Sequence, residues 1–328
     1  MRNRNIAPFG ACQRVLLTVL AALVFGGCTP KKQTDIGLHI TDRSGIEVSV
    51  PARVERVIST APSNTEIVIA LGMAAKLIAV DTYSRALAGL AGEPALIDFM
   101  YPDAEFILNL NPDLIIAAAH NQTGAGNDPF KLIREAGISV VYVPTSNSIN
   151  DIYGDIRFIA GLLGAAEGGE GIIRSMREEV EAVAARGASV GPKKSVYMEI
   201  SPFPFMVTCG KETYLDEMIE IIGAENIFAD KKGWFSPGAE AILERNPDVI
   251  LTLVNTSEAG DGSSQDGTSQ DVVEEIKGRS GFGTIRAVQN NDVYALDADS
   301  ASRPSPGIVL ALRQMARAVY PDWYAETD

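Results

Sequence analysis

The chain has 328 residues, a formal net charge of −14 and 46% hydrophobic residues. This length exceeds what one hydrophobic core usually supports and favours two domains. The acidic excess argues against nucleic acid as a partner, because a phosphate backbone repels a protein of the same sign.

The N-terminal segment has the features of an export signal. Three arginines precede an uncharged apolar run over residues 15–25, which is too short to span a bilayer. The run ends in Phe-Gly-Gly-Cys, which resembles a bacterial lipobox with Phe where Leu is more usual. We expect residues 1–27 to be removed and Cys28 to be lipidated, so that acyl chains hold an exported protein on the membrane surface. An ordinary secretory signal with an incidental cysteine is the alternative.

Removal of this segment changes the composition in two ways. The remaining chain has a net charge of −17, because the segment holds three basic and no acidic residues. Cys12 leaves with the signal and Cys28 carries the lipid, so Cys209 remains without a partner for an intramolecular disulfide.

Beyond the tether, strand-like runs alternate with helical segments, the pattern typical of parallel sheets. The expected strands are residues 54–59, 77–80, 114–118, 140–143, 195–200, 249–254 and 293–296. Helices are expected over residues 65–71, with Ser63 or Asn64 as the N-terminal cap and Gly72 at the end, and over residues 214–222.

A helical segment separates the two halves of this alternation. Residues 148–187 carry apolar side chains at helical spacing, interrupted by the glycine-containing residues 164–171. We interpret the segment as a stiff, largely helical linker between two lobes, which allows for a single long helix with a break in its middle. The expected organisation is a signal peptide at 1–27, a lipidated tether and lead-in at 28–50, an N-terminal lobe at 51–147, a linker at 148–190 and a C-terminal lobe at 191–328.

One motif occurs twice in the chain. Residues 105–113 read EFILNLNPD and residues 240–248 read EAILERNPD, and each motif leads into an apolar, strand-like run. The spacing of 135 residues is far longer than that of a solenoid repeat. It predicts two similar lobes that each carry the same helix, turn and strand, an arrangement that usually binds a ligand between the lobes.

Several motifs resemble the helical-backbone (class III) periplasmic binding proteins, the substrate-binding components of ABC importers for iron siderophores, haem and vitamin B12. They are the repeated motif, STAPSNTEIVIALG at 59–72, GKETYLDEMIEIIGAENIF at 210–228 and SRPSPGIVLAL at 302–312. The resemblance implies an α/β fold of two Rossmann-like lobes with parallel sheets, joined by a long, mostly helical linker, with the ligand crevice between the lobes. It also implies a monomeric, non-enzymatic protein without a cofactor that hands a metal chelate to a permease with a cytoplasmic ATPase.

The resemblance assigns docking residues. It matches Glu105 and Glu240, one on each lobe, to glutamates that dock into arginine pockets of the permease. Charged pairs of this kind fix register and steer encounter. The alternative is that both side chains are merely solvated, as isolated glutamates usually are. We interpret Glu66 as a structural helix residue.

The resemblance also points to aromatic ligand contacts. It matches Tyr83, Phe99 and Trp234 to positions where cobalamin binders place aromatic rings. Flat rings offer a large contact area with little rotamer entropy to lose. Phe203 and Phe205, in the loop after the strand at 195–200, are expected on the second lobe's side of the crevice.

The polar candidate residues do not identify the ligand. Arg85 and Arg303 could each bind a carboxylate or phosphate, with a surface ion pair as the alternative for Arg85. His120 follows a strand toward the crevice and could ligate haem iron, with Tyr83 as a phenolate alternative; no other direct metal ligand is expected. Ala118 stands where cobalamin binders have another ring. A ferric siderophore, a corrinoid and haem all remain candidates.

Other functional classes find little support in the motifs. The chain has no P-loop, no G-x-G-x-x-G after a strand, no H-E-x-x-H and no G-x-S-x-G. The acidic residues 258–271 form an expected solvated loop that does not match a calcium-binding EF-hand. An extracytoplasmic hydrolase on the same fold, or a surface lipoprotein without a transport role, is the alternative function.

Overall fold

The computed structural model describes residues 36–118, 128–254 and 269–325. The chain from Ile36 onward forms one compact unit. The expected signal peptide, Cys28, His120 and most of the acidic loop lie outside the described residues. In the described ranges, no helix is both long and apolar enough to cross a membrane.

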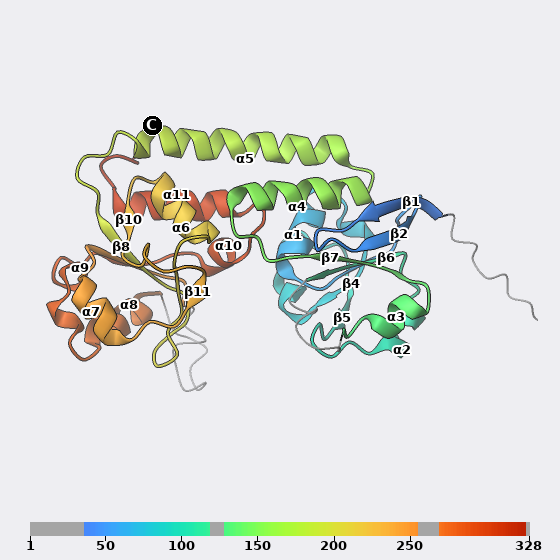
Figure 1. Ribbon diagram of the computed structural model, residues 1–328, viewed down its shortest axis with the longest axis horizontal. Helices are drawn as coiled ribbons and strands as arrows, with labels where there is room; N and C mark the ends of the chain where they lie inside the picture. Colours follow the sequence, from blue (N-terminus) through green and yellow to red (C-terminus); the bar gives the residue numbers. More distant parts are fainter. Residues whose placement is uncertain (1–35, 119–127, 255–268, 326–328) are drawn as a thin grey trace, which may run out of the picture. The chain divides into compact units, whose positions relative to one another are not determined.

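The first lobe is built on a five-stranded parallel sheet with the order β5-β4-β3-β6-β7 (Figure 1). Its strands are β3 Val57–Ser59, β4 Leu77–Asp81, β5 Ala95–Ile97, β6 Leu114–Ala118 and β7 Ser139–Val143. Its helices are α1 Pro62–Ala70, α2 Ala104–Asn109 and α3 Lys131–Glu135, with short 3₁₀ turns η1 Ala74–Lys76 and η2 Thr82–Ala86. Every residue of β3 and β6 is buried, as expected for short apolar strands in the middle of a parallel sheet.

The second lobe has a four-stranded parallel sheet with the order β10-β8-β12-β13. Its strands are β8 Ser195–Glu199, β10 Glu225–Asn226, β12 Val249–Thr252 and β13 Val293–Ala295, and a separate antiparallel ladder pairs β9 Thr208–Cys209 with β11 Trp234–Phe235. The helical elements are α6 Tyr214–Ile221, α7 Ala239–Arg245, α8 Ser269–Gly278, η4 Phe282–Thr284, α9 Arg286–Gln289, α10 Ala298–Ser302 and α11 Ile308–Val319. The predicted alternation, the parallel sheets and the two lobes are confirmed.

The repeated motif forms the same unit in both lobes. Asn111 and Asn246 adopt left-handed backbone angles, with φ of 48° and 45°, which asparagine tolerates better than most residues. The Oδ2 of Asp113 accepts a hydrogen bond from the N–H of Arg56 at 2.9 Å, and the Oδ2 of Asp248 accepts one from the N–H of Ser195 at 2.8 Å. Each aspartate therefore joins its motif to the start of the neighbouring strand, β3 or β8.

The linker is two helices and not one broken helix. α4 Ile149–Leu162 and α5 Ala166–Gly187 pack side by side after the chain reverses at residues 163–165 (Figure 1). The linker is largely helical, but the possibility of one long helix with a break in its middle does not hold, because most of residues 164–171 belongs to α5. Gly169 is buried where the helices meet, and a Cβ there would lie 2.6 Å from the Cβ of Ala160. This glycine permits close packing and does not break the helix.

An N-terminal hairpin covers the edge of the first sheet. β1 Ile36–Thr41 and β2 Glu47–Pro51 pair antiparallel, within the segment that the sequence suggested was a lead-in. Asp42 holds the turn, since its Oδ1 accepts hydrogen bonds from the N–H groups of Ser44 and Ile46, both at 2.9 Å. Its Oδ2 accepts a hydrogen bond from the N–H of Tyr142 on edge strand β7 at 2.8 Å. The hairpin is thereby joined to the first lobe.

Helix α1 begins earlier than predicted. Its N-cap is Ala61, which makes no side-chain capping hydrogen bond, and Pro62 opens the helix. Proline suits the first helical position, because its fixed φ matches the helix and its missing N–H would have no partner there anyway. The prediction of Ser63 or Asn64 as cap is therefore wrong, and both lie inside the first turn. Gly72, with φ of 73°, ends the helical segment as predicted.

Two glycines of α5 give opposite expectations for stability. Gly169→Ala forces a methyl group against α4 and should lower the free energy of unfolding by about 1–3 kcal/mol, the usual effect of overpacking. A Cβ at Gly171 meets only the end of the Arg174 side chain, 3.9 Å away. Gly171→Ala should therefore raise the free energy of unfolding by up to about 1 kcal/mol, because alanine has the higher helix propensity. Urea unfolding of both variants measures the difference. Equal changes in the free energy of unfolding of the two variants would contradict the close packing of α4 on α5.

Candidate functional site

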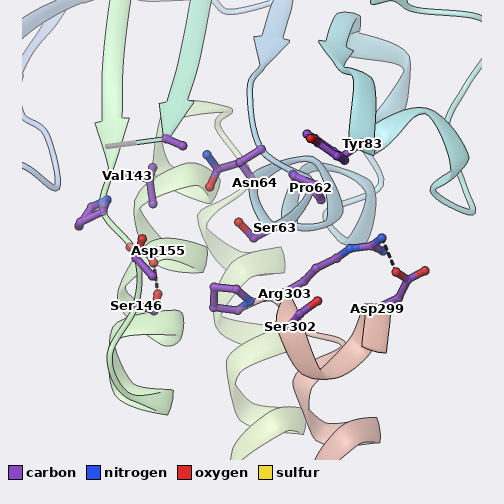
Figure 2. A pocket seen from close by; sticks show the side chains of 15 residues that line it. Pro62, Ser63, Asn64, Tyr83, Val143, Ser146, Asp155, Asp299, Ser302 and Arg303 are labelled. Atoms are coloured by element: carbon purple, nitrogen blue, oxygen red, sulfur yellow. Dashed lines mark hydrogen bonds and ion pairs between the residues drawn. The ribbon is translucent and has the colours of Figure 1, made fainter. Parts of the chain in front are cut away.

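A cavity of about 450 Å³ lies between the two lobes (Figure 2). Its lining on the first lobe is Ala61, Pro62, Ser63, Asn64, Tyr83, Ala118, Val143, Pro144, Thr145 and Ser146, on linker helix α4 Asp155, and on the second lobe Asp299, Ser302, Arg303 and Pro304. Ala118 and Val143 are the last residues of β6 and β7. The cavity therefore opens beyond the carboxyl ends of a parallel sheet, where ligands of open α/β folds bind.

A buried chain of hydrogen bonds positions the first lobe's side of this cavity. The hydroxyl of Thr65 donates to the Oγ of Ser59 at 2.8 Å, and the hydroxyl of Ser84 is 3.1 Å from the Oγ1 of Thr65. Ser84 also bonds the Oδ2 of Asp81, whose Oδ1 accepts from the N–H of Tyr83 at 2.9 Å. All of these side chains except that of Tyr83 are buried. The network ties the start of α1 to η2.

Tyr83 projects from this rigid base. Its side chain is 68% exposed, and its ring centroid lies 6.1 Å from that of Phe99. The position of the ring is set by the backbone of η2, which Asp81 caps. The two aromatic rings form a contact surface at the edge of the cavity that a flat ligand can use.

Arg303 forms the opposite wall and is held by two carboxylates. Its Nη1 lies 3.0 Å from the Oε1 of Glu66 on α1, and its Nη2 lies 2.6 Å from the Oδ1 of Asp299. The hydroxyl of Ser305 bonds the other oxygen of Glu66. Glu66 thus connects the lobes, a role that its interpretation as a helix residue missed, because its partners follow 237 and 239 residues later.

Asp155 supports the loop that follows β7. It is only 3% exposed, and its Oδ1 accepts from the Nε of Arg43 at 2.7 Å while its Oδ2 accepts from the hydroxyl of Ser146 at 2.6 Å. Burial raises the pKa of this carboxyl above its ordinary value, although both hydrogen bonds work against the shift. Because both oxygens have partners, Asp155 positions residues 143–146 and leaves ligand contact to its neighbours.

The remaining ligand candidates lie away from the cavity lining. Arg85, Phe203 and Phe205 are exposed, and Trp234 packs against Tyr214 with ring centroids 5.6 Å apart. None of these four predicted residues lines the cavity. Tyr83 and Arg303 therefore line the cavity, Phe99 packs against Tyr83 without lining it, and His120 lies outside the described residues. Among the described residues, no cluster of three or more His, Cys, Asp or Glu side chains could hold a metal ion.

The two candidate docking residues occupy equivalent places. Glu105 and Glu240 are each the second residue of their helix, α2 and α7, and both are exposed. Neither forms an ion pair with a described residue. Their side chains are available to a partner, and their docking role stays a prediction.

Comparison with known proteins establishes the family. A sequence profile described as periplasmic binding protein matches residues 57–300. The chain belongs to this family. It is 30% identical over 323 residues to YvrC of Bacillus subtilis, an uncharacterized ABC transporter substrate-binding lipoprotein, covering 94% of this chain and 96% of that protein. A vitamin B12-binding protein of Vibrio cholerae is 29% identical over 268 residues, covering 81% of this chain and 89% of that protein.

A solved structure agrees with this family assignment. The crystal structure of a possible iron-binding (periplasmic solute-binding) protein from Staphylococcus epidermidis has a TM-score of 0.69 and 30% sequence identity. The match covers 82% of this chain and 99% of that chain. These relatives are named as binding proteins and not as enzymes.

The contact between Glu66 and Arg303 should stabilise the folded chain. Glu66→Ala removes a hydrogen-bonded, half-buried ion pair and should lower the free energy of unfolding by about 1–2 kcal/mol. Glu170→Ala removes the more exposed pair with Arg157, in which both side chains are about half exposed, and should lower the free energy of unfolding less than Glu66→Ala does. Urea unfolding compares the two. An equal loss of unfolding free energy in both variants would show that the contact between the lobes stabilises the chain no more than an exposed ion pair does.

The pH dependence of stability should report the burial of Asp81. Burial raises the pKa of this carboxyl above 3.8, although hydrogen bonds from Ser84 and Tyr83 oppose the shift. Between the ordinary and the raised pKa, the folded state holds a proton that the unfolded state has lost. The stability of wild type relative to Asp81→Asn should therefore fall as pH rises from about 4 through the raised pKa.

A second carboxyl provides a control of opposite sign. Hydrogen bonds from Arg53 and Lys76 lower the pKa of exposed Glu55. The stability of wild type relative to Glu55→Gln should fall as pH drops toward this lowered pKa. Urea unfolding at several pH values measures both trends. The same trend at Asp81 and Glu55 would contradict the assigned effect of burial.

Proposed function

We propose that this chain captures a metal chelate in the cavity between its lobes and delivers it to the permease of an ABC importer. The observation that carries the proposal is a cavity that both lobes line, beyond the carboxyl ends of a parallel sheet, in a member of the periplasmic binding protein family. An iron siderophore, a corrinoid and haem are the candidate cargoes. The vitamin B12-binding relative and the iron-binding structural relative favour this class of ligand.

The rim of the cavity supports capture of a broad, flat ligand. The volume of about 450 Å³ lies within the range of about 300–1,000 Å³ typical of small-molecule sites. Tyr83 and Phe99 offer adjacent rings on the first lobe. On the second lobe, Phe203 and Phe205 are 57% and 81% exposed, an unusual exposure for such apolar side chains. We assign Phe203, Phe205, Trp234 and Arg85 to ligand contacts outside the cavity lining. Arg303 is assigned to a polar contact within the lining.

The anchor, localisation and assembly complete the proposal. The lipobox-like sequence at Cys28 supports an exported protein held on the membrane surface by acyl chains. The B. subtilis relative is named as a lipoprotein, which agrees with this anchor. The proposed organisation keeps the sequence-based boundaries, with residues 28–50 as tether and lead-in, and the protein acts as a monomer with one permease and its ATPase.

Delivery is assigned to the two equivalent glutamates. Glu105→Lys combined with Glu240→Lys should abolish stimulation of the permease ATPase, because each lysine would face arginine pockets of like charge. Chelate affinity should stay unchanged, since neither residue lines the cavity. ATPase activity in proteoliposomes with the cognate permease, together with an equilibrium titration of the chelate, measures both.

The matched control is a glutamate on the linker. Glu178 is exposed on α5, and Glu178→Lys alters the net charge without touching either motif. It should leave ATPase stimulation intact. A loss of chelate affinity in the double variant, or normal stimulation by it, would contradict the docking role.

A further inference from the structure

The side chain of Asn64 has an unexplained donor at the cavity. Asn64 is 2% exposed and lines the cavity, yet its Nδ2 has no hydrogen-bond partner in the described part of the chain (Figure 2). A buried polar atom left unpaired is unfavourable, because it has lost its hydrogen bonds to water without gaining others. Such a donor at a ligand cavity has a physical rationale if a ligand atom becomes its partner.

The start of α1 supplies further free donors at the same place. The first turn's earliest hydrogen bond within the helix runs from the N–H of Thr65 to the carbonyl of Ala61 at 3.0 Å. The N–H groups of Ser63 and Asn64 come before it and find no acceptor among the described residues. Neither a capping side chain nor an acidic residue occupies the first turn. These N–H groups carry the partial positive charge of a helix N-terminus, which favours an anion.

We propose that the start of α1 is a subsite for an oxyanionic group of the ligand, a carboxylate or a phosphate. The Nδ2 of Asn64 and the N–H groups of Ser63 and Asn64 are its donors. This inference rests on the proposed function and deepens it by naming the chemistry that the cargo must present at one end. A ligand oxygen there would give the buried amide its missing partner.

The charges around the cavity shape this subsite. Arg303 faces the cavity but is already paired with Glu66 and Asp299, and Asp155 is paired with Arg43. The anion would therefore be held mainly by directed hydrogen bonds and the helix dipole, and less by an unpaired positive side chain. Selectivity should depend on the presence of an anionic oxygen at the right place. Blocking that oxygen chemically should remove the interaction.

The test uses the full chain, purified in detergent, and isothermal titration with defined probes. The probes are haem and its dimethyl ester, which differ only in free carboxylates, together with ferric citrate, cyanocobalamin and molybdate. Asn64→Leu keeps the shape of the side chain and removes its donors. Asn64→Asp places a negative charge where the anion binds, and the same charge favours a helix N-terminus. Asn109→Asp, on the exposed end of α2, is the matched control.

The expected result separates binding from folding. At least one carboxylate- or phosphate-bearing probe should bind the wild type. Its affinity should fall about 10-fold or more in Asn64→Leu, because a hydrogen bond to a charged group is lost, and further in Asn64→Asp, because a like charge opposes the anion. Thermal unfolding of Asn64→Leu should be unchanged or shifted upward, because an unpaired buried donor is removed. Asn109→Asp should bind as the wild type does.

Each contrary outcome has a definite meaning. Equal affinity for haem and its ester, with no effect of the Asn64 variants, would overturn the subsite and leave chelate transport standing. Destabilised Asn64 variants with unchanged affinity would make the residue structural and also overturn it. Binding of molybdate alone, lost in both Asn64 variants, would support the subsite and refute the proposed metal-chelate cargo. Failure of every anionic probe to bind the wild type would refute the subsite.

Discussion

The position of the cavity depends on the hydrogen bonds that join Asp81, Ser84, Thr65 and Ser59. They connect the ends of β3 and β4 to the first turn of α1 in a region where every one of these side chains is buried. Because buried polar groups are costly to leave unpaired, this network permits few alternative positions for α1. Tyr83 then lines the cavity from a fixed backbone, and the first residues of α1 line the same cavity.

The second constraint is the way the lobes are held together. A Cβ on Gly187, at the end of α5, would lie 2.2 Å from the carbonyl oxygen of Ile221, so α5 meets the end of α6 through backbone contact. The N–H of Ile149, at the start of α4, donates to the Oε2 of Glu217 on α6 at 2.7 Å. Both ends of the linker are thus fixed to α6 of the second lobe. Glu66 and Arg303 connect the two lobes at the cavity.

Local patterns predicted the scaffold well, and long-range contacts account for what they missed. The apolar runs at 114–118 and 249–254 located β6 and β12, and the repeated Asn-Pro-Asp turn located the equivalent unit of each lobe. The cap of α1 was misplaced because Pro62 can open a helix without a capping side chain. The linker was misjudged because Gly169 is needed for packing against α4, a contact that helix propensity alone does not reveal.

The candidate site was only partly predictable for the same reason. Tyr83 and Arg303 carry chemistry that the sequence motifs indicate, and the structure brings both to one cavity. The contributions of Glu66 and Asp155 depend on partners more than a hundred residues away, and no local pattern marks them. The unpaired amide of Asn64 becomes visible only when the whole hydrogen-bond network is known.

Capture of a metal chelate at this cavity is tested most directly by an equilibrium titration of wild type and Tyr83→Ala with ferric siderophores, cyanocobalamin and haem. Tryptophan fluorescence and ligand absorbance report the binding. Such capture predicts saturable, one-to-one binding of one chelate by the wild type. It also predicts a loss of about tenfold or more in the variant, because an aromatic contact and its buried area disappear. Absence of binding to every chelate, or binding that Tyr83→Ala leaves unchanged, would contradict capture of a metal chelate at this cavity.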